Sequence, residues 1–183
     1  MENQIKQTGF DYYEEKGREL FKKICAEQIV GCKVIKESTD KMAHWDMAAT
    51  IKGKPIIIEI KVRNYLSTTF QEWYYESYKH TQLLKLKEKA DKKKETDIFY
   101  VNFFEDNAFR IWKTNNIHTT QQTNTVMTQQ TTVGNKEEWV ATKVYSCDIE
   151  NEYMRGEIEE EIFKNHPTGQ QEDITDFTNP FNR

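Results

Sequence analysis

The sequence predicts one layered α/β domain with a mixed β-sheet, and three observations lead to this expectation. The chain has 183 residues, the length of a single domain with its own core. The expected elements run helix, three strands, helix, two strands, an order typical of a sheet covered by helices. The content of 31% charged and 13% aromatic residues is typical of a folded chain with a polar surface.

The first half of the chain predicts a helix and three strands. Apolar residues recur near the helical period over 10–28, which indicates an amphipathic helix. Strands are expected at 29–35, 44–51 and 54–63. A two-residue turn that contains glycine separates the last two, so we expect them to form a β-hairpin.

The second half predicts a long helix followed by more strands. Residues 70–94 contain no Pro or Gly and carry aromatic and leucine residues at helical spacing, so we expect one continuous helix. A tract rich in Thr, Gln and Asn at 114–132 is expected as a surface insertion or an extended hairpin. The remaining expected elements are strands at 97–104, 109–112 and 139–145 and a short acidic helix at 149–163.

Charge is distributed unevenly along the chain. Residues 52–94 carry eleven Lys and Arg against five Asp and Glu, whereas residues 146–183 carry three against ten. The basic middle is where a polyanion would bind, because phosphate binding depends on the local density of Lys and Arg. We therefore expect a functional domain at 1–145, with a polar insertion at 114–135. The segment 146–183 is expected as an acidic helix and a flexible tail, with protein interaction as one role for the tail.

The cellular setting follows from what the sequence lacks. No apolar run approaches the roughly 20 residues of a membrane-spanning helix, and the start of the chain has no signal-like apolar segment. We expect a cytoplasmic protein without membrane contact. Because Cys25, Cys32 and Cys147 form no CxxC pair, the sequence indicates neither a zinc site nor a disulfide framework, and we expect buried reduced thiols.

The expected hairpin at 44–63 carries the candidate chemistry. With a two-residue turn, cross-strand partners have residue numbers that sum to 105, so Asp46 faces Glu59. Alternation along the strands places Asp46, Glu59 and Lys61 on one face, while the other face is almost pure hydrocarbon. Directly opposed carboxylates destabilise a sheet by up to about 1 kcal/mol, so this arrangement requires an explanation.

A divalent cation would explain the opposed carboxylates. Mg²⁺ binds carboxylate oxygens, keeps several waters and accepts substrate phosphates as further ligands. Lys61 would then orient or help deprotonate an attacking water and offset the charge that develops on the phosphate. The alternative is an ordinary salt-bridged patch on the exposed face of a hairpin. The turn, the apolar run around Glu59 and the upstream helix agree with one another and favour the site.

These residues resemble a known family. An acidic residue on one strand, followed by Glu59-Ile60-Lys61 at the end of an apolar strand between two helices, resembles the PD-(D/E)xK, or restriction-endonuclease-like, nuclease superfamily. The resemblance spans about residues 10–112. It implies an αβββαβ core with a central mixed sheet flanked by helices and Mg²⁺-dependent cleavage of DNA, with Mn²⁺ as a substitute. It also implies metal binding at Asp46, Glu59 and Ile60 and a catalytic Lys61.

The resemblance also implies site residues from the two helices. Many members place a glutamate of the first helix beside the metal, and Glu14 lies on the sheet-facing stripe of that helix. Glu15 is the second choice. From the second helix, Gln82 and Lys79 are the candidates. Trp45 stands where the name of the family has proline, which many members lack.

For the aromatic residues near these positions, the sequence predicts no specific role. We expect Trp73, Tyr74 and Tyr78 in the core rather than as platforms for base stacking. His44, opposite Lys61, is expected either as a donor to the site or as an ordinary residue at a strand end.

The leading hypothesis is a Mg²⁺-dependent endo- or exodeoxyribonuclease that uses a metal-activated water. Stand-alone domains of this size are similar to Holliday-junction resolvases and to small phage or restriction nucleases. No dedicated sequence-reading module is recognisable, which favours structure-selective or weakly specific cleavage. A homodimer is expected for cutting both strands. The alternative is a non-catalytic nucleic-acid-binding or protein-interaction module on the same fold.

Overall fold

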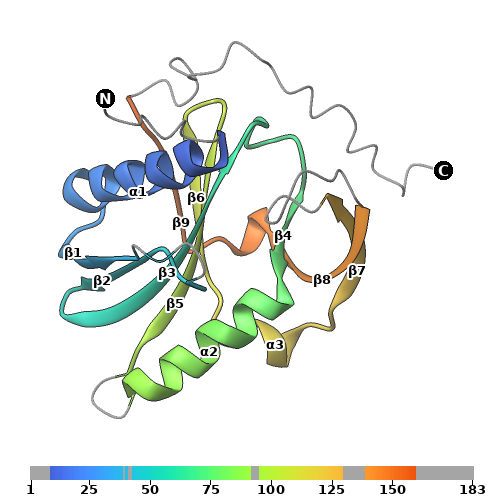
Figure 1. Ribbon diagram of the computed structural model, residues 1–183. Coiled ribbons are helices and arrows are strands. Elements are labelled where there is room, and N and C mark those ends of the chain that lie inside the picture. Colours follow the sequence, from blue (N-terminus) through green and yellow to red (C-terminus); the bar gives the residue numbers. More distant parts are fainter. Residues whose placement is uncertain (1–8, 39, 41–42, 92–94, 130–138, 160–183) are drawn as a thin grey trace, which may run out of the picture.

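The chain folds around a large mixed sheet with a long helix on each face, as the computed structural model shows (Figure 1). The structure describes residues 9–38, 40, 43–91, 95–129 and 139–159. The predicted fold class, an α/β domain with an αβββαβ core and a central mixed sheet flanked by helices, is confirmed. None of the helices in these ranges is long and apolar enough to cross a bilayer.

The large sheet has six strands in the order β1-β2-β3-β5-β6-β9. Its strands are β1 (Cys32–Glu37), β2 (Met47–Ile51), β3 (Lys54–Arg63), β5 (Asp97–Phe104), β6 (Ala108–Lys113) and β9 (Met154–Glu157). The central pair β3–β5 is parallel and the other neighbours are antiparallel, so the sheet is mixed. Every residue of β5 is buried, as expected for a strand covered on both faces.

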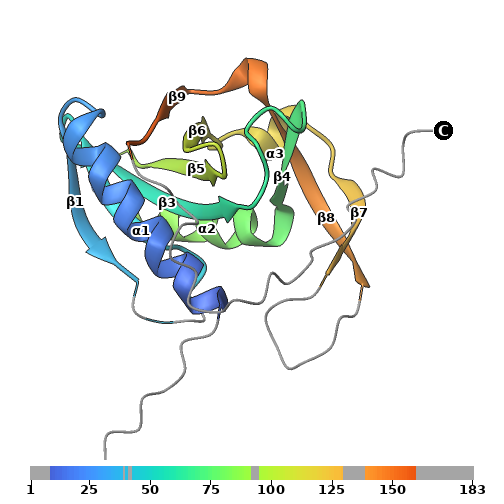
Figure 2. The same ribbon diagram turned by 90° about the horizontal axis from the view of Figure 1, so that it is seen from above.

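Helix α1 (Gly9–Glu27) covers one face of the large sheet, over β1 and β3 (Figure 2). Its fully buried residues Leu20, Phe21 and Ile24 belong to the same core cluster as Met47 and Ile58 of the hairpin. Burial of one such side chain contributes about 2 kcal/mol, so this stripe fixes the helix to the sheet.

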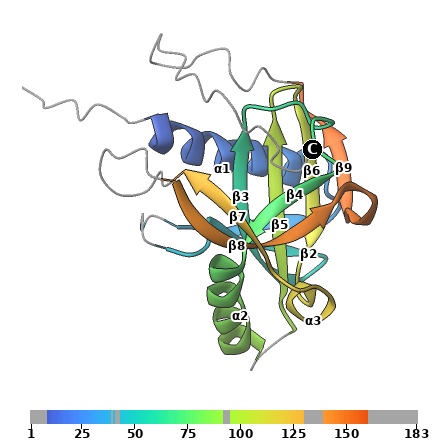
Figure 3. The ribbon, with the colours of Figure 1, turned by 90° about the vertical axis from the view of Figure 1, so that its right-hand side faces the viewer.

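The opposite face is covered by α2 (Ser77–Asp91) and by a small sheet of order β4-β8-β7. Its strands are β4 (Glu72–Glu76), β8 (Trp139–Asp148) and β7 (Asn124–Gln129), and they cross the strands of the large sheet (Figure 3). A second core cluster lies between the two sheets and contains Trp73, Tyr75 and Tyr100. The short helices α3 (Ile117–Thr120) and η1 (Ile149–Asn151) connect these elements.

The prediction of one helix over 70–94 is wrong in its first part, which forms β4. Trp73 and Tyr75 are buried while Tyr74 between them is 41% exposed, which is the two-residue period of a strand. Aromatic side chains favour strands, and β4 pairs with β8, with Trp73 opposite Cys147. The prediction of a helix rested on the spacing of Trp73, Tyr74 and Tyr78, which fits a helical period.

The predicted acidic helix at 149–163 is also wrong. A single 3₁₀ turn at 149–151 is followed by β9, and residues from 160 onward, including the predicted tail, lie outside the described part of the chain. β9 exists because it pairs with β6, where Gly156 lies opposite Phe109. A Cβ atom at Gly156 would stand 2.6 Å from Cε1 of Phe109, so the missing side chain permits the pairing.

The remaining boundaries differ less from expectation. The first strand starts at Cys32 rather than residue 29, because a turn with Gly31 at φ +77° comes first. Of the polar tract, expected as a surface insertion or an extended hairpin, residues 124–129 form β7, which pairs antiparallel with β8 beyond the tract. β8 runs through residue 145, the expected end of the main domain, to Asp148.

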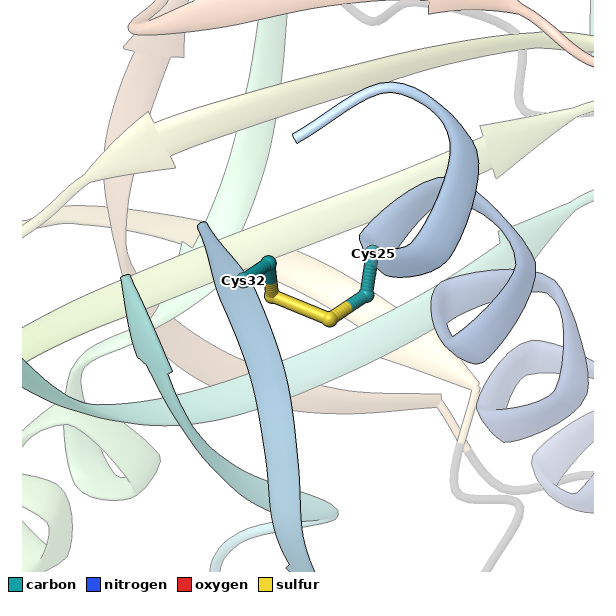
Figure 4. The surroundings of a disulfide bond; sticks show 2 residues. All are labelled: Cys25 and Cys32. Atoms are coloured by element: carbon teal, nitrogen blue, oxygen red, sulfur yellow. A yellow bond between two sulfur atoms is a disulfide. The ribbon is translucent and has the colours of Figure 1, made fainter. Parts of the chain in front are cut away.

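The expectation of three reduced cysteines is wrong for two of them. Cys25 at the end of α1 and Cys32 at the start of β1 form a disulfide (Figure 4). The tight connection between the two elements brings their Cα atoms to 5.2 Å, a normal separation for a disulfide. Cys147 is a free buried thiol as expected, and burial raises its pKa.

Candidate active site

The β2–β3 hairpin has the register that the sequence predicts. Met47 pairs with Ile58 and Ile51 with Lys54 across a turn whose residues, Lys52 and Gly53, have φ values of 50° and 80°. Positive φ at both central residues is the conformation that matches the twist of a two-residue hairpin. The turn therefore fixes which residues of the two strands meet.

Asp46 lies directly before β2, at the edge of β3. Its backbone N–H donates to the carbonyl of Ile58 at 2.9 Å, and its Oδ2 accepts a hydrogen bond from the N–H of Ile60 at 2.6 Å. The carboxylate thus accepts the hydrogen bond of a β3 backbone N–H that lies beyond the end of β2.

Glu59 is the buried centre of the cluster, with a side chain that is 1% exposed. Its Oε1 lies 3.0 Å from Nζ of Lys61 and 2.9 Å from Nζ of Lys79, and its Oε2 accepts a hydrogen bond from Lys79 at 3.1 Å. Burial alone would raise the pKa of Glu59, but the two ammonium groups outweigh it and lower the pKa below the ordinary value. Glu59 is therefore ionised.

The two carboxylates act on each other. Burial, and after it the charge of Glu59, raises the pKa of Asp46 to about 7, against the opposing effects of Lys61 and the Ile60 N–H. Without a cation, burial and the charge of Glu59 therefore favour the protonated form of Asp46 far more than in a free aspartate. The charge of Glu59 contributes to the raised pKa of Asp46, as the sequence predicts for opposed acids, although burial is the larger cause.

Lys61 and Lys79 close the cluster toward solvent. Their side chains are 31% and 24% exposed. Burial would lower the pKa of Lys61, but Glu59, Asp46 and Glu76 raise it above the ordinary value. Lys61 is therefore a cation, suited to orienting a water or a phosphate oxygen rather than to accepting a proton.

The residues present fit a divalent cation. The buried Oε1 of Glu59 has two ammonium groups at ion-pair distance but no hydrogen-bond partner of regular geometry. Hard oxygen ligands are what Mg²⁺ and Mn²⁺ prefer. In a strand, the N–H and C=O of one residue point to the same side, so the carbonyl of Ile60 faces the edge where Asp46 lies.

The structure does not assemble a third carboxylate ligand within the described residues, where no group of three His, Cys, Asp or Glu side chains could hold a metal. Glu14 and Glu15 lie on α1, which packs on the face of β3 opposite Glu59 through Gly17. Their part in the site stays a prediction.

From the second helix, Lys79 rather than Gln82 contacts Glu59. The amide oxygen of Gln82 lies 3.5 Å from Nζ of Lys85. Sequence reasoning missed Glu76, whose charge acts on Lys61. Glu76 lies at the junction of β4 and α2, and this junction does not exist in the single continuous helix that the sequence predicts.

Comparison with known proteins adds a structural likeness. No protein-family model and no curated protein matches the sequence. Among solved structures, the chain is similar to Hjc, a Holliday junction resolvase from the archaeal hyperthermophile Archaeoglobus fulgidus, with a TM-score of 0.45 and 11% identity. The match covers 75% of this chain and 87% of Hjc. A likeness with this TM-score and identity assigns no function to the chain.

Aromatic side chains beside the cluster differ from expectation. Trp73 is in the core as predicted, but Tyr74 is 41% and Tyr78 is 63% exposed. The ring of Tyr78 meets the ring of His44 edge to face, with centroids 5.5 Å apart. Tyr78 precedes Lys79, and His44 lies two residues before Asp46, so this aromatic pair joins the two segments that carry the site.

Proposed function

We propose that the chain is a divalent-metal-dependent deoxyribonuclease that hydrolyses DNA phosphodiester bonds. One observation carries the proposal: a fully buried carboxylate, Glu59, shares its surroundings with the carboxyl group of Asp46 and is flanked by two ammonium groups. Clusters of strongly perturbed ionisable groups are typical of active sites. The residues fit the Mg²⁺-binding and catalytic roles that the resemblance to PD-(D/E)xK nucleases implies.

Each residue has a separate role in this proposal. Asp46, Glu59 and the carbonyl of Ile60 would hold Mg²⁺, or Mn²⁺ in its place. The metal would polarise the phosphate and activate the water that attacks it. Lys61 donates to a phosphate oxygen or to the water and offsets negative charge as it develops. Lys79 holds Glu59 in place through both carboxylate oxygens.

Charge supports DNA as the substrate. Residues 52–94, which include β3 and α2, carry an excess of six positive charges, while the whole chain has a net charge of -4. The segment of the chain that carries Glu59, Lys61 and Lys79 is therefore also its most basic one, which favours phosphate binding. A homodimer would serve cleavage of both strands of a duplex, of a branched junction or of a specific site.

The test is cleavage of plasmid and branched DNA with Mg²⁺ or Mn²⁺. We expect Glu59→Gln and Lys61→Ala each to lower the rate by about 100-fold or more, because the first removes a proposed metal ligand and the second removes the positive charge that would offset negative charge on the phosphate. The matched control is Glu72→Gln, which removes an exposed carboxylate from β4 and should leave the rate unchanged. Equal cleavage by wild type and both site variants would refute the proposal.

One observation favours a second function. In the structure, Lys61 and Lys79 already neutralise Glu59, so the buried acid has partners without a cation. This is what a non-catalytic nucleic-acid-binding module on the same fold would need. DNA binding without cleavage under any metal, together with the absence of Mg²⁺ or Mn²⁺ binding in calorimetry, would support that function instead.

A further inference from the structure

We propose that Tyr78 stacks on an unpaired DNA base, so that the site selects DNA in which bases next to the scissile phosphate are unpaired. This inference rests on the proposed nuclease function and names its substrate class. Tyr78 is the second residue of α2. Its side chain is 63% exposed, although the ring is large and mostly apolar.

The ring contacts the segment that leads to Asp46. His44 contacts it edge to face, with an interplanar angle of 87°. An edge-to-face contact uses one side of the pair and leaves ring surface of Tyr78 open to solvent, in agreement with its exposure. A ring that is already positioned loses little conformational freedom when a ligand stacks on it, which favours binding.

Position and charge identify the ligand. Tyr78 precedes Lys79 in α2, and its ring contacts His44, two residues before Asp46. The ammonium groups of Lys79 and Lys61 are within 3.0 Å of Glu59, while their side chains keep 24% and 31% exposure. A flat aromatic surface next to partly exposed cations is the combination that binds single-stranded nucleic acid, the cations for the phosphates and the ring for a base.

Base pairing decides which DNA can use the ring. In a continuous duplex each base is stacked between its neighbours, so an aromatic side chain has no free base surface to contact. A fully paired four-way junction offers little more. Forks, flaps and single-stranded arms present bases whose flat surfaces are open, and these are the substrates that Tyr78 would favour.

A purely structural role makes a different prediction. If Tyr78 only holds the segment around His44 against α2, its removal affects every DNA to the same extent, because the site itself would be displaced. If Tyr78 stacks on a base, its removal affects only DNA with unpaired bases. The ratio of affinities for fork and duplex therefore separates the two roles.

The experiment measures binding of the full chain to three labelled DNAs by fluorescence anisotropy in EDTA, so that cleavage does not interfere. The probes are a forked duplex with single-stranded arms, the fully paired duplex of the same sequence, and a four-way junction. We expect wild type to prefer the fork over both paired DNAs. Tyr78→Leu keeps an apolar side chain without the ring and should reduce the fork-to-duplex ratio about tenfold.

Two further variants complete the test. Tyr78→Phe keeps the ring and should retain the ratio. Tyr153→Leu is the matched control, because Tyr153 is also largely exposed, at 54%, and lies beside β9 at the far edge of the large sheet. It should leave the ratio unchanged. 2-Aminopurine placed in the fork arm should be quenched by wild type and Tyr78→Phe but not by Tyr78→Leu.

The outcomes separate this inference from the proposed function. An unchanged ratio in Tyr78→Leu, or no preference for the fork in wild type, would overturn the stacking role even if the chain cleaves DNA. A Tyr78-dependent preference in a chain that cleaves no DNA with Mg²⁺ or Mn²⁺ would support stacking and refute the nuclease proposal.

Discussion

At the scale of single residues, the chemistry of the site depends on how Asp46 loses its proton. Its carboxyl group has neighbours that oppose ionisation, burial and Glu59, and neighbours that favour it, above all Lys61. The balance raises its pKa to about 7. A cation that binds at this carboxylate has to compete with that proton, so metal binding and pH are linked.

This linkage gives a prediction about stability. A carboxyl group whose pKa is raised from 3.8 to about 7 in the folded chain stabilises the fold while protonated, and that contribution is lost as the pH rises through about 7. We therefore expect Mg²⁺ to raise the melting temperature more at a pH of about 8 than at about 5.5, because the proton no longer competes.

Thermal melts with Mg²⁺ and with EDTA at the two pH values test this linkage. Asp46→Asn serves as the control, since it removes both the proton and the metal ligand. In EDTA at the higher pH it should melt above wild type, and Mg²⁺ should not stabilise it further. A Mg²⁺ effect of equal size at both pH values in wild type would contradict the assignment.

At the scale of elements, Gly17 determines how closely α1 approaches β3. A Cβ atom at this position would lie 2.9 Å from Cγ2 of Ile60 and 3.2 Å from Cγ2 of Val62. Ile60 is also the residue whose N–H holds Asp46. The contact between helix and strand therefore lies directly behind the candidate site.

We expect Gly17→Val to destabilise the protein by about 2 kcal/mol, because the added side chain overpacks the contact between α1 and β3. Urea denaturation measures the change in the free energy of unfolding. Glu19→Val adds the same β-branched side chain at an exposed position of α1 and should have an effect well under half as large. Equal effects of the two substitutions would contradict the packing explanation, because valine has a higher helix propensity than the glycine it replaces at 17 and a lower one than the glutamate it replaces at 19.

At the scale of the whole molecule, the disulfide acts on the unfolded chain. Cys25 and Cys32 are separated by seven positions, and closing a loop of this size removes conformational entropy worth about 2.5 kcal/mol from the unfolded state. We expect a reducing agent to lower the free energy of unfolding by about this amount. A Cys25→Ala, Cys32→Ala double variant should be insensitive to the reductant, whereas loss of stability in both proteins would point to another cause.

Much of the fold and part of the site could be predicted from the sequence. The hairpin register followed by counting from a two-residue turn, and the burial of Glu59 followed from the apolar run around it. Both depend on neighbours in the chain. β4 could not be recognised, because the spacing of Trp73, Tyr74 and Tyr78 fits a helical face, and the strand is stabilised by pairing with β8, which is distant in the sequence.

The other partners of the site were less accessible to sequence reasoning. The contact between Lys79 and Glu59 depends on where α2 begins and how it lies on the sheet, neither of which is local. Pairing of Cys25 with Cys32 depends on the turn between α1 and β1. A basic residue at 79 and an acid at 59 are visible in the sequence, but their meeting is a property of tertiary packing.

The place of β9 has a consequence for biosynthesis. β9 is the last described strand in chain order, yet it pairs with β6 and forms one border of the large sheet. A nascent chain that has not yet released residues 154–157 from the ribosome therefore carries β6, with its apolar Phe109 and Ile111, as an open edge. Until translation passes this point, the growing polypeptide exposes a template for wrong strand pairing, which makes it a natural client for chaperones.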